Sequence, residues 1–323
     1  MKPDFPDTGL TVVVATRNGV CWLPDLFASL ARQTLMLARL SILDDASTDG
    51  TWDLVRDAAV PGGQTVAGRQ ETNEGAIGTF QRLLSMVDTE YFALCDQDDV
   101  WLSDKLENSA RLLEMSGADL VYTDLRVVDE DLNELAPSMW RLSNIVPVTG
   151  HAVVPLLLKN SVTGCTVVAR RQLLERALPF PDGIPMHDWW LALVAACGSG
   201  VQALHEQTVL YRQHGTNALG AAKFSSKGLS DLLERRHLTM GTYTLTRLSG
   251  RLALIRGLEE RNLAHLPFLR RFYRLPTGLR LVLSPIYLGY TVTRAHVLGW
   301  RNLLVDAALT CLPLGSSHKG VTA

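Results

Sequence analysis

Up to Asp124, short apolar runs alternate with stretches in which apolar residues recur at helical spacing. The apolar runs are typical of buried strands and comprise residues 10–15, 40–43, 91–95 and 120–122, with a shorter run centred on Val66. The stretches of helical spacing predict helices at residues 22–34, 75–87 and 102–115. Strands that alternate with helices in this way indicate βαβ units. We therefore predict an α/β fold with a mostly parallel sheet flanked by helices.

The pattern changes beyond Asp124, where a long segment rich in loop-forming residues follows (129–160). The later predicted elements are strands at 163–169 and 208–212 and helices at 172–177 and 187–197. From Leu229 onward only helical patterns rich in Arg and Leu remain. These observations predict that the α/β domain is followed by an α-helical C-terminal module.

Charge divides the chain at nearly the same place. Residues 1–222 carry 16 Lys and Arg against 28 Asp and Glu, and residues 223–323 carry 15 against 5, which gives balances of −12 and +10 within a net charge of −2. This step predicts two domains, 1–222 and 223–323, the second of which faces an anionic partner. Lipid headgroups or a phosphorylated lipid fit that charge as well as nucleic acid does.

The C-terminal module allows three interpretations. Residues 281–292 are apolar but are interrupted by Pro285 and Gly289, and arginines and aromatic residues surround them. A helical segment of this kind is typical of peripheral contact with a membrane. A plain helical cap with solvated charges fits the same pattern, and so does a dimer interface.

Targeting signals and cysteine usage bear on the compartment. The N-terminus has no signal-peptide pattern, and no run of about 18 apolar residues is available for a membrane-spanning helix. The five cysteines are scattered, without the spacing of a zinc site, and buried thiols in a reducing compartment account for them. We expect a cytoplasmic protein, with the inner face of the cell membrane as its place of contact with lipid.

The most informative feature is the sequence Asp96-Gln97-Asp98-Asp99 at the end of an apolar run. Carboxylates so close together repel one another unless a cation neutralises them. Oxygen ligands of this kind suit Mg²⁺ or Mn²⁺, ions that usually bridge one or two carboxylates to the phosphates of a substrate. The alternative is a polar turn that caps the following helix.

Two other strand ends also carry polar residues, namely Thr16-Arg17-Asn18 and Asp44-Asp45. Because parallel strands end at one edge of a sheet, we expect these residues to meet the acidic cluster in one crevice. Either Ser47 or Asp49 is suited to cap the helix that follows the second strand. With Asp45 on the base or ribose and a metal on the phosphates, the crevice suits a nucleotide diphosphate. The chain contains neither GxxxxGK[ST] nor a GxGxxG after the first strand, which disfavours ATPase and dinucleotide sites.

On these residues the chain resembles a family-2 glycosyltransferase with a GT-A fold. The segments that match are 12–18, 30–34, 44–51, 73–75 and 96–101, and three later segments, 160–166, 187–190 and 211–217, resemble the rhamnosyltransferase-like branch. The ordered set covers about residues 10–220 and is more specific than any single motif in it. One departure is Thr79, which stands where many relatives carry Asn.

The resemblance implies a role for each matching residue. The nucleotide-sugar-binding residues would be Thr16, Arg17, Asn18, Asp45, Asn73, Asp96, Asp99 and Arg212. Asp98 would ligate Mg²⁺ or Mn²⁺, and His214 resembles the late histidine that completes the metal site in some relatives. Asp188 occupies the position of the general base.

The residues themselves also support Asp188 as the base. Transfer of a sugar with inversion requires a group that deprotonates the acceptor hydroxyl, and a carboxylate beside Trp189 and Trp190 can have a raised pKa suited to that role. Arg212 and the metal would stabilise the departing diphosphate. The alternative for Asp188 is a helix cap. His187 fits a structural role better than a catalytic one.

The resemblance further implies an inverting transferase that moves rhamnose from dTDP-rhamnose to a growing surface polysaccharide or a polyprenyl-diphosphate-linked glycan. Nucleic acid is not expected as a partner. The alternatives are a transferase that uses another UDP-hexose or UDP-HexNAc donor, a nucleotidyltransferase, and a non-catalytic scaffold that binds nucleotide sugars. A nucleotidyltransferase usually carries a Gly-rich basic loop after its first strand, which this chain lacks.

Overall fold

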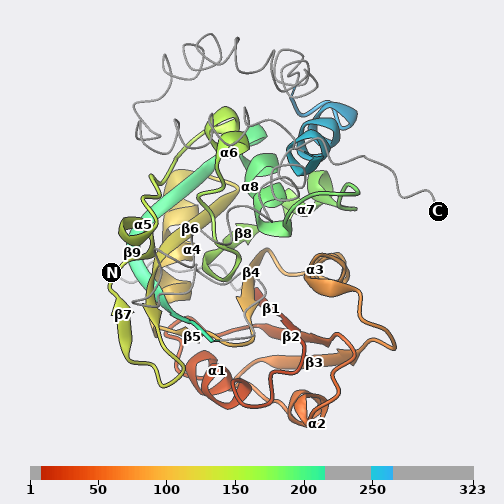
Figure 1. Ribbon diagram of the computed structural model, residues 1–323, viewed down its shortest axis with the longest axis vertical. Helices are drawn as coiled ribbons and strands as arrows, with labels where there is room; N and C mark the ends of the chain where they lie inside the picture. The colour runs from red at the N-terminus through yellow and green to blue at the C-terminus, as the bar shows by residue number, and fades with distance from the viewer. Residues whose placement is uncertain (1–8, 215–248, 265–323) are drawn as a thin grey trace, which may run out of the picture. The chain divides into compact units, whose positions relative to one another are not determined.

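The computed structural model describes residues 9–214 and 249–264 (Figure 1). The chain divides into two compact units, the first made of Met1–Phe180 and Met186–Ala218 and the second of Pro181–Pro185 and Leu219–Ala323. Most of the described residues belong to the first unit. In the second, residues 249–260 are helical, as the sequence predicts there. The rest of the predicted C-terminal module lies outside the described residues.

The first unit is built on one nine-stranded sheet with the strand order β3-β2-β1-β4-β8-β6-β9-β5, to which β7 is added beside β6. Its strands are β1 (Leu10–Thr16), β2 (Arg39–Asp44), β3 (Gln64–Arg69), β4 (Tyr91–Asp96), β5 (Val100–Trp101), β6 (Leu120–Val128), β7 (Glu134–Ala136), β8 (Val168–Arg170) and β9 (Val201–Arg212). The first four strands of the order run parallel, as predicted. Beyond them the sheet is mixed, because β8 runs antiparallel to both β4 and β6.

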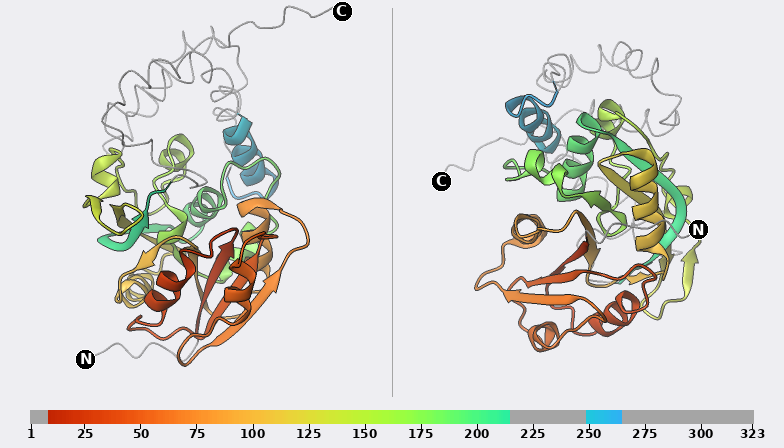
Figure 2. Two further views of the ribbon diagram at one scale, coloured as in Figure 1. Left: turned by 60° about the horizontal axis from the view of Figure 1, so that its bottom comes forward. Right: turned by 180° about the vertical axis from the view of Figure 1, so that it is seen from behind.

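Helices cover both faces of the parallel part of the sheet. They are α1 (Leu23–Leu30), α2 (Thr51–Arg56), α3 (Gly75–Ser85), α4 (Lys105–Ser116), α5 (Met139–Leu142), α6 (Val153–Leu158), α7 (Gln172–Ala177) and α8 (His187–Cys197), with one 3₁₀ turn, η1 (Gly164–Thr166). Figures 1 and 2 show α1 and α2 on one side of β1–β3 and α3 on the other. The central strands are therefore screened from water on both faces, and the side chains of Val12, Val13 and Val14 are fully buried.

The sequence pattern missed two short strands, namely β5 and, within the segment predicted to be rich in loops, β7. Val100 and Trp101 form β5, which pairs antiparallel with Val209 and Leu210 of β9, and the N–H of Leu102 then donates to the carbonyl of Thr208 at 2.9 Å. The helix predicted from residue 102 therefore begins only at Lys105, because the preceding residues are held extended. A two-residue strand is too short to give a periodic signal.

Strands β6 and β9 are longer than the predicted runs 120–122 and 208–212 because polar residues interrupt their apolar patterns. Their parallel pairing shifts register at Asp124, where the carboxylate of this buried residue accepts four hydrogen bonds. The donors are the N–H groups of Leu125 and Trp140, the hydroxyl of Ser138 and the amide of Gln207. Asp124 thus ties α5 and β9 to the irregular part of β6.

We expect Asp124→Ala to lower the free energy of unfolding by about 3 kcal/mol, because four donors lose their acceptor and most of them stay buried. Urea unfolding of the purified chain measures the change. Asp131→Ala is the matched control, since Asp131 is exposed and its removal should change stability by less than about 0.5 kcal/mol. Equal stabilities of the two variants would contradict the structural role of Asp124.

Candidate active site

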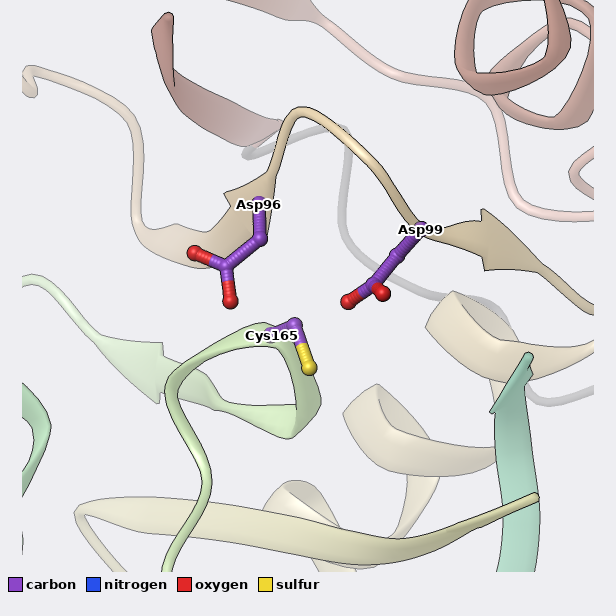
Figure 3. A group of neighbouring side chains, drawn as sticks. All are labelled: Asp96, Asp99 and Cys165. Atoms are coloured by element: carbon purple, nitrogen blue, oxygen red, sulfur yellow. The ribbon is translucent and has the colours of Figure 1, made fainter. Parts of the chain in front are cut away.

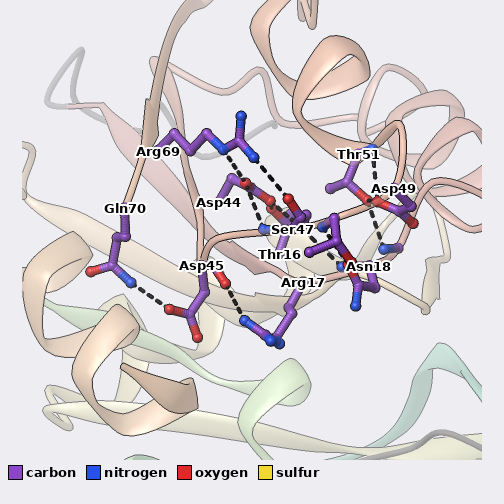
Figure 4. Close-up of polar contacts among 12 residues, drawn as sticks. Thr16, Arg17, Asn18, Asp44, Asp45, Ser47, Asp49, Thr51, Arg69 and Gln70 are labelled. Atoms are coloured by element: carbon purple, nitrogen blue, oxygen red, sulfur yellow. Dashed lines mark hydrogen bonds and ion pairs between the residues drawn. The ribbon is translucent and has the colours of Figure 1, made fainter. Parts of the chain in front are cut away.

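The polar ends of β1, β2 and β4 meet, as predicted. The side-chain amide of Gln97 pairs with the backbone of Arg17 in both directions: its oxygen accepts from the Arg17 N–H at 2.8 Å and its Nε2 donates to the Arg17 carbonyl at 2.9 Å. The guanidinium of Arg17 donates to the carbonyl of Asp45 at 2.6 Å (Figure 4). A Cβ at Gly19 would lie 2.2 Å from Oε1 of Gln97, so a side chain at this position would displace the amide from the backbone of Arg17.

Asp44 organises the loop that follows β2. Its buried carboxylate accepts from the hydroxyl of Thr16 at 3.2 Å and from the N–H of Ser47 at 3.1 Å, and the guanidinium of Arg69 lies 3.4 Å away (Figure 4). The hydroxyl of Ser47 in turn accepts from the N–H of Asn18 at 2.9 Å. The predicted nucleotide-binding residues Thr16 and Asn18 are therefore fixed by the neighbouring strand end.

The predicted capping role of Ser47 is wrong. The N-cap position of α2 is Gly50, without a side-chain cap, and Ser47 instead bonds to Asp44. Asp49 comes closer to the prediction, because its carboxylate accepts from the N–H of Thr51 at 2.9 Å.

The carboxylate of Asp45 holds the start of α3. It accepts from the backbone N–H of Glu74 at 2.7 Å and of Gly75 at 2.9 Å, and from Nε2 of Gln70 at 2.7 Å. Asn73 also reaches this turn, since its side-chain oxygen accepts from the same Gly75 N–H at 2.9 Å. Two of the predicted nucleotide-binding residues therefore shape the loop over the crevice.

Thr79, which stands where many relatives carry Asn, forms two hydrogen bonds in α3. Its hydroxyl accepts from Nε2 of Gln70 at 3.1 Å and donates to the carbonyl of Gly75 at 2.9 Å. The departure from the family pattern is thus accommodated by the same amide that supports Asp45.

The carboxylates after β4 crowd together in a buried position. Ligand atoms of Asp96, Asp99 and Cys165 all lie within 4.8 Å of one another (Figure 3). Burial and the neighbouring charges of Asp98 and Asp188 raise the pKa of Asp96 to about 7. Burial and the charges of Asp98 and Asp96 also raise the pKa of Asp99 well above its usual range. The Cys165 thiol beside them was not foreseen, because the sequence places it in an ordinary apolar strand.

Asp98 and His214 form the pair that the sequence assigns to a metal. Nε2 of His214 lies 2.8 Å from Oδ2 of Asp98, and the imidazole stacks on the ring of Trp22 with the centroids 4.8 Å apart. A carboxylate and an imidazole at this separation fit two ligands of one divalent cation. A positive ion there would also offset the repulsion among the acidic residues, and Oδ2 of buried Asp99 has no hydrogen-bond partner among the described residues. The residues present therefore fit a metal site.

Arg212 is buried and its guanidinium is already engaged. Nε donates to the carbonyl of Asp98 at 3.0 Å, Nη1 donates to the carbonyl of Glu130 at 2.7 Å, and Nη2 pairs with Asp25 at 2.8 Å. The group also lies over the ring of Trp22 at 4.7 Å. The guanidinium thus holds the acidic loop, and its contact with the leaving diphosphate stays a prediction.

Lys105 is a further buried charge that the sequence did not single out. It is fully buried at the start of α4, its Nζ lies 4.5 Å from the centre of the Trp101 ring, and among the described residues this Nζ has no hydrogen-bond partner. Burial lowers the pKa of Lys105 to about 8, although the nearby thiols and Asp99 act against this. An ammonium group behind the acidic loop provides part of the charge balance of the site.

Asp188 lies in the first turn of α8, but the N-cap of that helix is Met186. Oδ1 of Asp188 accepts from the N–H of Trp189 and, at 3.3 Å, from the side-chain amide of Asn160. Burial raises the pKa of Asp188 to about 6, while the hydrogen bonds from Trp189, Gly164 and Asn160 act to lower it. The charge of Asp188 also contributes to the raised pKa of Asp96.

His187, the residue before it, has the features of a structural residue. Its ring is buried and stacks on Phe80 with the centroids 4.1 Å apart. Neither ring nitrogen has a hydrogen-bond partner among the residues that the structure describes, and burial lowers its pKa to about 3. The imidazole is therefore neutral at physiological pH.

If Arg212 holds the acidic loop, Arg212→Lys should lower the free energy of unfolding by about 2 kcal/mol, because a single ammonium cannot reach the same set of acceptors. Thermal or urea unfolding measures this. Arg32→Lys, at an exposed position, is the control for the exchange itself. A variant of unchanged stability with reduced turnover would instead favour a direct role on the leaving group.

Comparison with known proteins finds glycosyltransferases that are similar to this chain. The chain is 27% identical over 234 residues to the dTDP-rhamnosyl transferase RfbG of Shigella flexneri, a match that covers 67% of this chain and 78% of RfbG. It is 24% identical over 115 residues to WfaP of Escherichia coli, a UDP-Glc:alpha-D-GlcNAc-diphosphoundecaprenol beta-1,3-glucosyltransferase, covering 36% of this chain and 45% of WfaP.

Solved structures share the fold. S. aureus TarS 1-349, also solved in complex with UDP-GlcNAc, superposes with a TM-score of 0.54 at 15% identity, covering 94% of this chain and 90% of TarS 1-349. The model of glycosyl transferase family 2 matches residues 11–178, the part of the chain that carries the polar strand ends. The chain therefore belongs to glycosyl transferase family 2 and has the GT-A fold.

Proposed function

We propose that this glycosyltransferase works by a metal-dependent, inverting mechanism and that its donor is dTDP-rhamnose. The observation that carries the mechanism is that two groups lie beside the turn η1. They are the acidic residues after β4, since ligand atoms of Asp96, Asp99 and Cys165 lie within 4.8 Å of one another, and the separate carboxylate of Asp188 on α8, against which Gly164 packs. One group suits the charged nucleotide diphosphate, and the other suits proton transfer from an acceptor.

The donor side of the site is formed by the loops after β1, β2 and β4. The loops that contain Thr16, Arg17 and Asn18 are braced by hydrogen bonds to neighbouring strand ends, so their backbone is in place before the nucleotide arrives. Asp45 and Asn73 hold the loop that leads into α3. A rigid crevice of this kind lowers the entropy that is lost when the nucleotide is positioned.

The metal-binding residues would be Asp98 and His214, with Asp96 and Asp99 beside them. A Mg²⁺ or Mn²⁺ ion held there supplies positive charge where the diphosphate leaves. Asp98 and His214 fix the position of that charge, and Arg212 fixes Asp98 by binding its carbonyl. The protein thereby keeps the charge-bearing loop in one conformation.

Asp188 would act as the general base. Its carboxylate accepts the proton from the acceptor hydroxyl as the oxygen forms a bond to the anomeric carbon and the bond to the diphosphate breaks. Because the oxygen attacks from the face opposite the leaving group, the configuration is inverted. A pKa of about 6 leaves the group ionised at neutral pH yet more basic than an ordinary aspartate.

The choice of rhamnose is supported by the similarity to RfbG, and a polyprenyl-diphosphate-linked acceptor is supported by the printed function of WfaP. WfaP also favours a second candidate, transfer from a UDP-hexose. Within the described part of the chain, no helix has both the length and the apolar character needed to cross a bilayer. We propose that the enzyme works at the cytoplasmic face of the membrane, where the basic C-terminal residues contact lipid or a second copy of the chain.

A donor panel tests the proposal. With Mn²⁺ or Mg²⁺ present, we expect release of dTDP from dTDP-rhamnose and little product from UDP-glucose, UDP-GlcNAc or UDP-galactose. Asp98→Ala should reduce turnover at least about 100-fold, because the charge on the diphosphate is then poorly held, whereas Asp131→Ala should not. Turnover of a UDP-hexose alone would show that the donor is that UDP-hexose and not dTDP-rhamnose. Full activity in the presence of a chelator would contradict the proposed metal dependence.

The pH dependence tests the base. Because only the ionised carboxylate accepts a proton, kcat should rise with pH through a midpoint near the raised pKa of Asp188, about 6, and level off above it. The measurement is kcat at saturating donor from about pH 4.5 to about pH 8, with circular dichroism at each pH to check that the protein is folded. Asp188→Asn should abolish the acid limb together with most of the turnover. A flat profile would contradict the assignment.

A further inference from the structure

Asn160 contacts the carboxylate of Asp188, although it lies 28 positions earlier in the chain. Nδ2 donates to Oδ1 of Asp188 at 3.3 Å, and Oδ1 of Asn160 accepts from the N–H of Val162 at 3.0 Å. The second bond fixes the orientation of the amide, because the oxygen is held by its own turn and only the NH₂ group is left to face the carboxylate. Asn160 is thus a donor that is aimed at Asp188.

The same segment makes a second contact with Asp188. The backbone of Gly164 lies beside the carboxylate and acts to lower the pKa of Asp188. A Cβ at Gly164 would lie 3.4 Å from Nε2 of His187 and 3.6 Å from Oδ2 of Asp188, so a glycine lets the loop pack closely on the start of α8. Asp188 is therefore held from two points of one short loop.

The far end of this segment reaches the acidic loop. Cys165 follows Gly164 directly, and its Sγ lies within 4.8 Å of ligand atoms of Asp96 and Asp99 (Figure 3). The segment is also fixed to the sheet, because the hydroxyl groups of Ser161 and Tyr122 lie 3.3 Å apart. Residues 160–165 thus touch both halves of the site, the base at one end and the charge-bearing carboxylates at the other.

We propose that residues 160–165 set the position of Asp188 relative to the acidic loop and that Asn160 is the positioning residue that orients the Asp188 carboxylate for proton transfer. This inference rests on the proposed role of Asp188 as the base. Asn160 acts through Asp188 and needs no contact with either substrate.

A hydrogen-bond donor that faces a carboxylate affects the pKa of that carboxylate, which a purely structural residue does not. A hydrogen bond to the ionised form favours that form, so its loss should move the titration of the base to higher pH. The other groups around Asp188 are the carboxylate of Asp96 from β4 and the neutral imidazole of His187. Both of these side chains are kept when Asn160 is replaced.

The experiment compares Asn160→Asp with the wild-type enzyme, using the nucleotide sugar that is active in the donor panel. Asn160→Asp keeps the size of the side chain and the oxygen that Val162 needs, but it replaces the donor by a carboxylate. We expect the midpoint of the kcat–pH profile to rise by about one pH unit or more and kcat at pH 6.5 to fall about tenfold. KM for the donor should stay within about twofold of the wild-type value.

Asn160→Ala removes the donor without adding a charge, so it should move the midpoint in the same direction by a smaller amount, and it carries the test if Asn160→Asp does not fold. Gln64→Glu is the matched control for an added charge, because Gln64 is exposed at the start of β3 and faces Arg39. Its pH profile should equal that of the wild-type enzyme.

Two results would overturn the proposal in different ways. If Asp188→Asn remains active, Asp188 is not the base and the proposed function fails with respect to its mechanism. If Asp188→Asn is inactive but both Asn160 variants keep the wild-type midpoint, whether or not kcat falls, Asn160 does not orient the base. Binding of dTDP by calorimetry and thermal unfolding, measured on every variant, show that each comparison is made on folded protein.

Discussion

Three carboxylates within four residues, Asp96, Asp98 and Asp99, stand at the end of a buried strand, and their mutual repulsion is the constraint around which the site is arranged. Bringing such groups out of water costs several kcal/mol for each one that stays ionised without a partner. Raised pKa values of Asp96 and Asp99 express that cost. The loop is stable as a charged unit only if positive charge is placed near it.

The protein provides part of that charge and fixes the geometry of the rest. Lys105 contributes an ammonium group from behind. Arg212 binds the carbonyl of Asp98, so that it shapes the loop through its backbone. His214 lies against the Asp98 carboxylate. These contacts hold the acidic surface in one conformation, as electrostatic preorganisation requires. A cation and a diphosphate would bind to that surface.

The carboxylates of the loop after β2 differ from those after β4 because they have different hydrogen-bond partners. Asp44 and Asp45 are buried, yet each accepts hydrogen bonds from nearby backbone or side-chain groups. They brace the crevice. Asp188 shares a feature with each group: it accepts hydrogen bonds, as Asp44 and Asp45 do, and its pKa is raised, as that of Asp96 is. The roles proposed for these aspartates, as a brace, a metal ligand or a base, thus differ with the hydrogen-bond donors that reach each carboxylate.

Much of this could be read from the sequence. The alternation of apolar runs with helical spacing gives the parallel strands β1 to β4 and the helices between them, because strands that are buried on both faces must be continuously apolar. Polar residues directly after those runs place Thr16, Asp45 and Asp98 at one edge, since parallel strands share a direction. The family resemblance also follows from the order of short motifs along residues 10–220, and the prediction that Asp188 is the base follows from its place in that order and from the two tryptophans beside it.

The tertiary structure alone decided the contacts between distant segments. Strand β5 and the full length of β6 and β9 depend on pairing between segments, which local pattern does not encode. No local signal marks Cys165 as a neighbour of Asp99, Lys105 as its counter-charge, or Asn160 as the partner of Asp188. Arg212 could be recognised as important from its motif, but its role depends on three acceptors far away in the chain. Sequence spacing thus determined which residue types reach the site, and packing of the late segments against the early sheet decided what each of them does there.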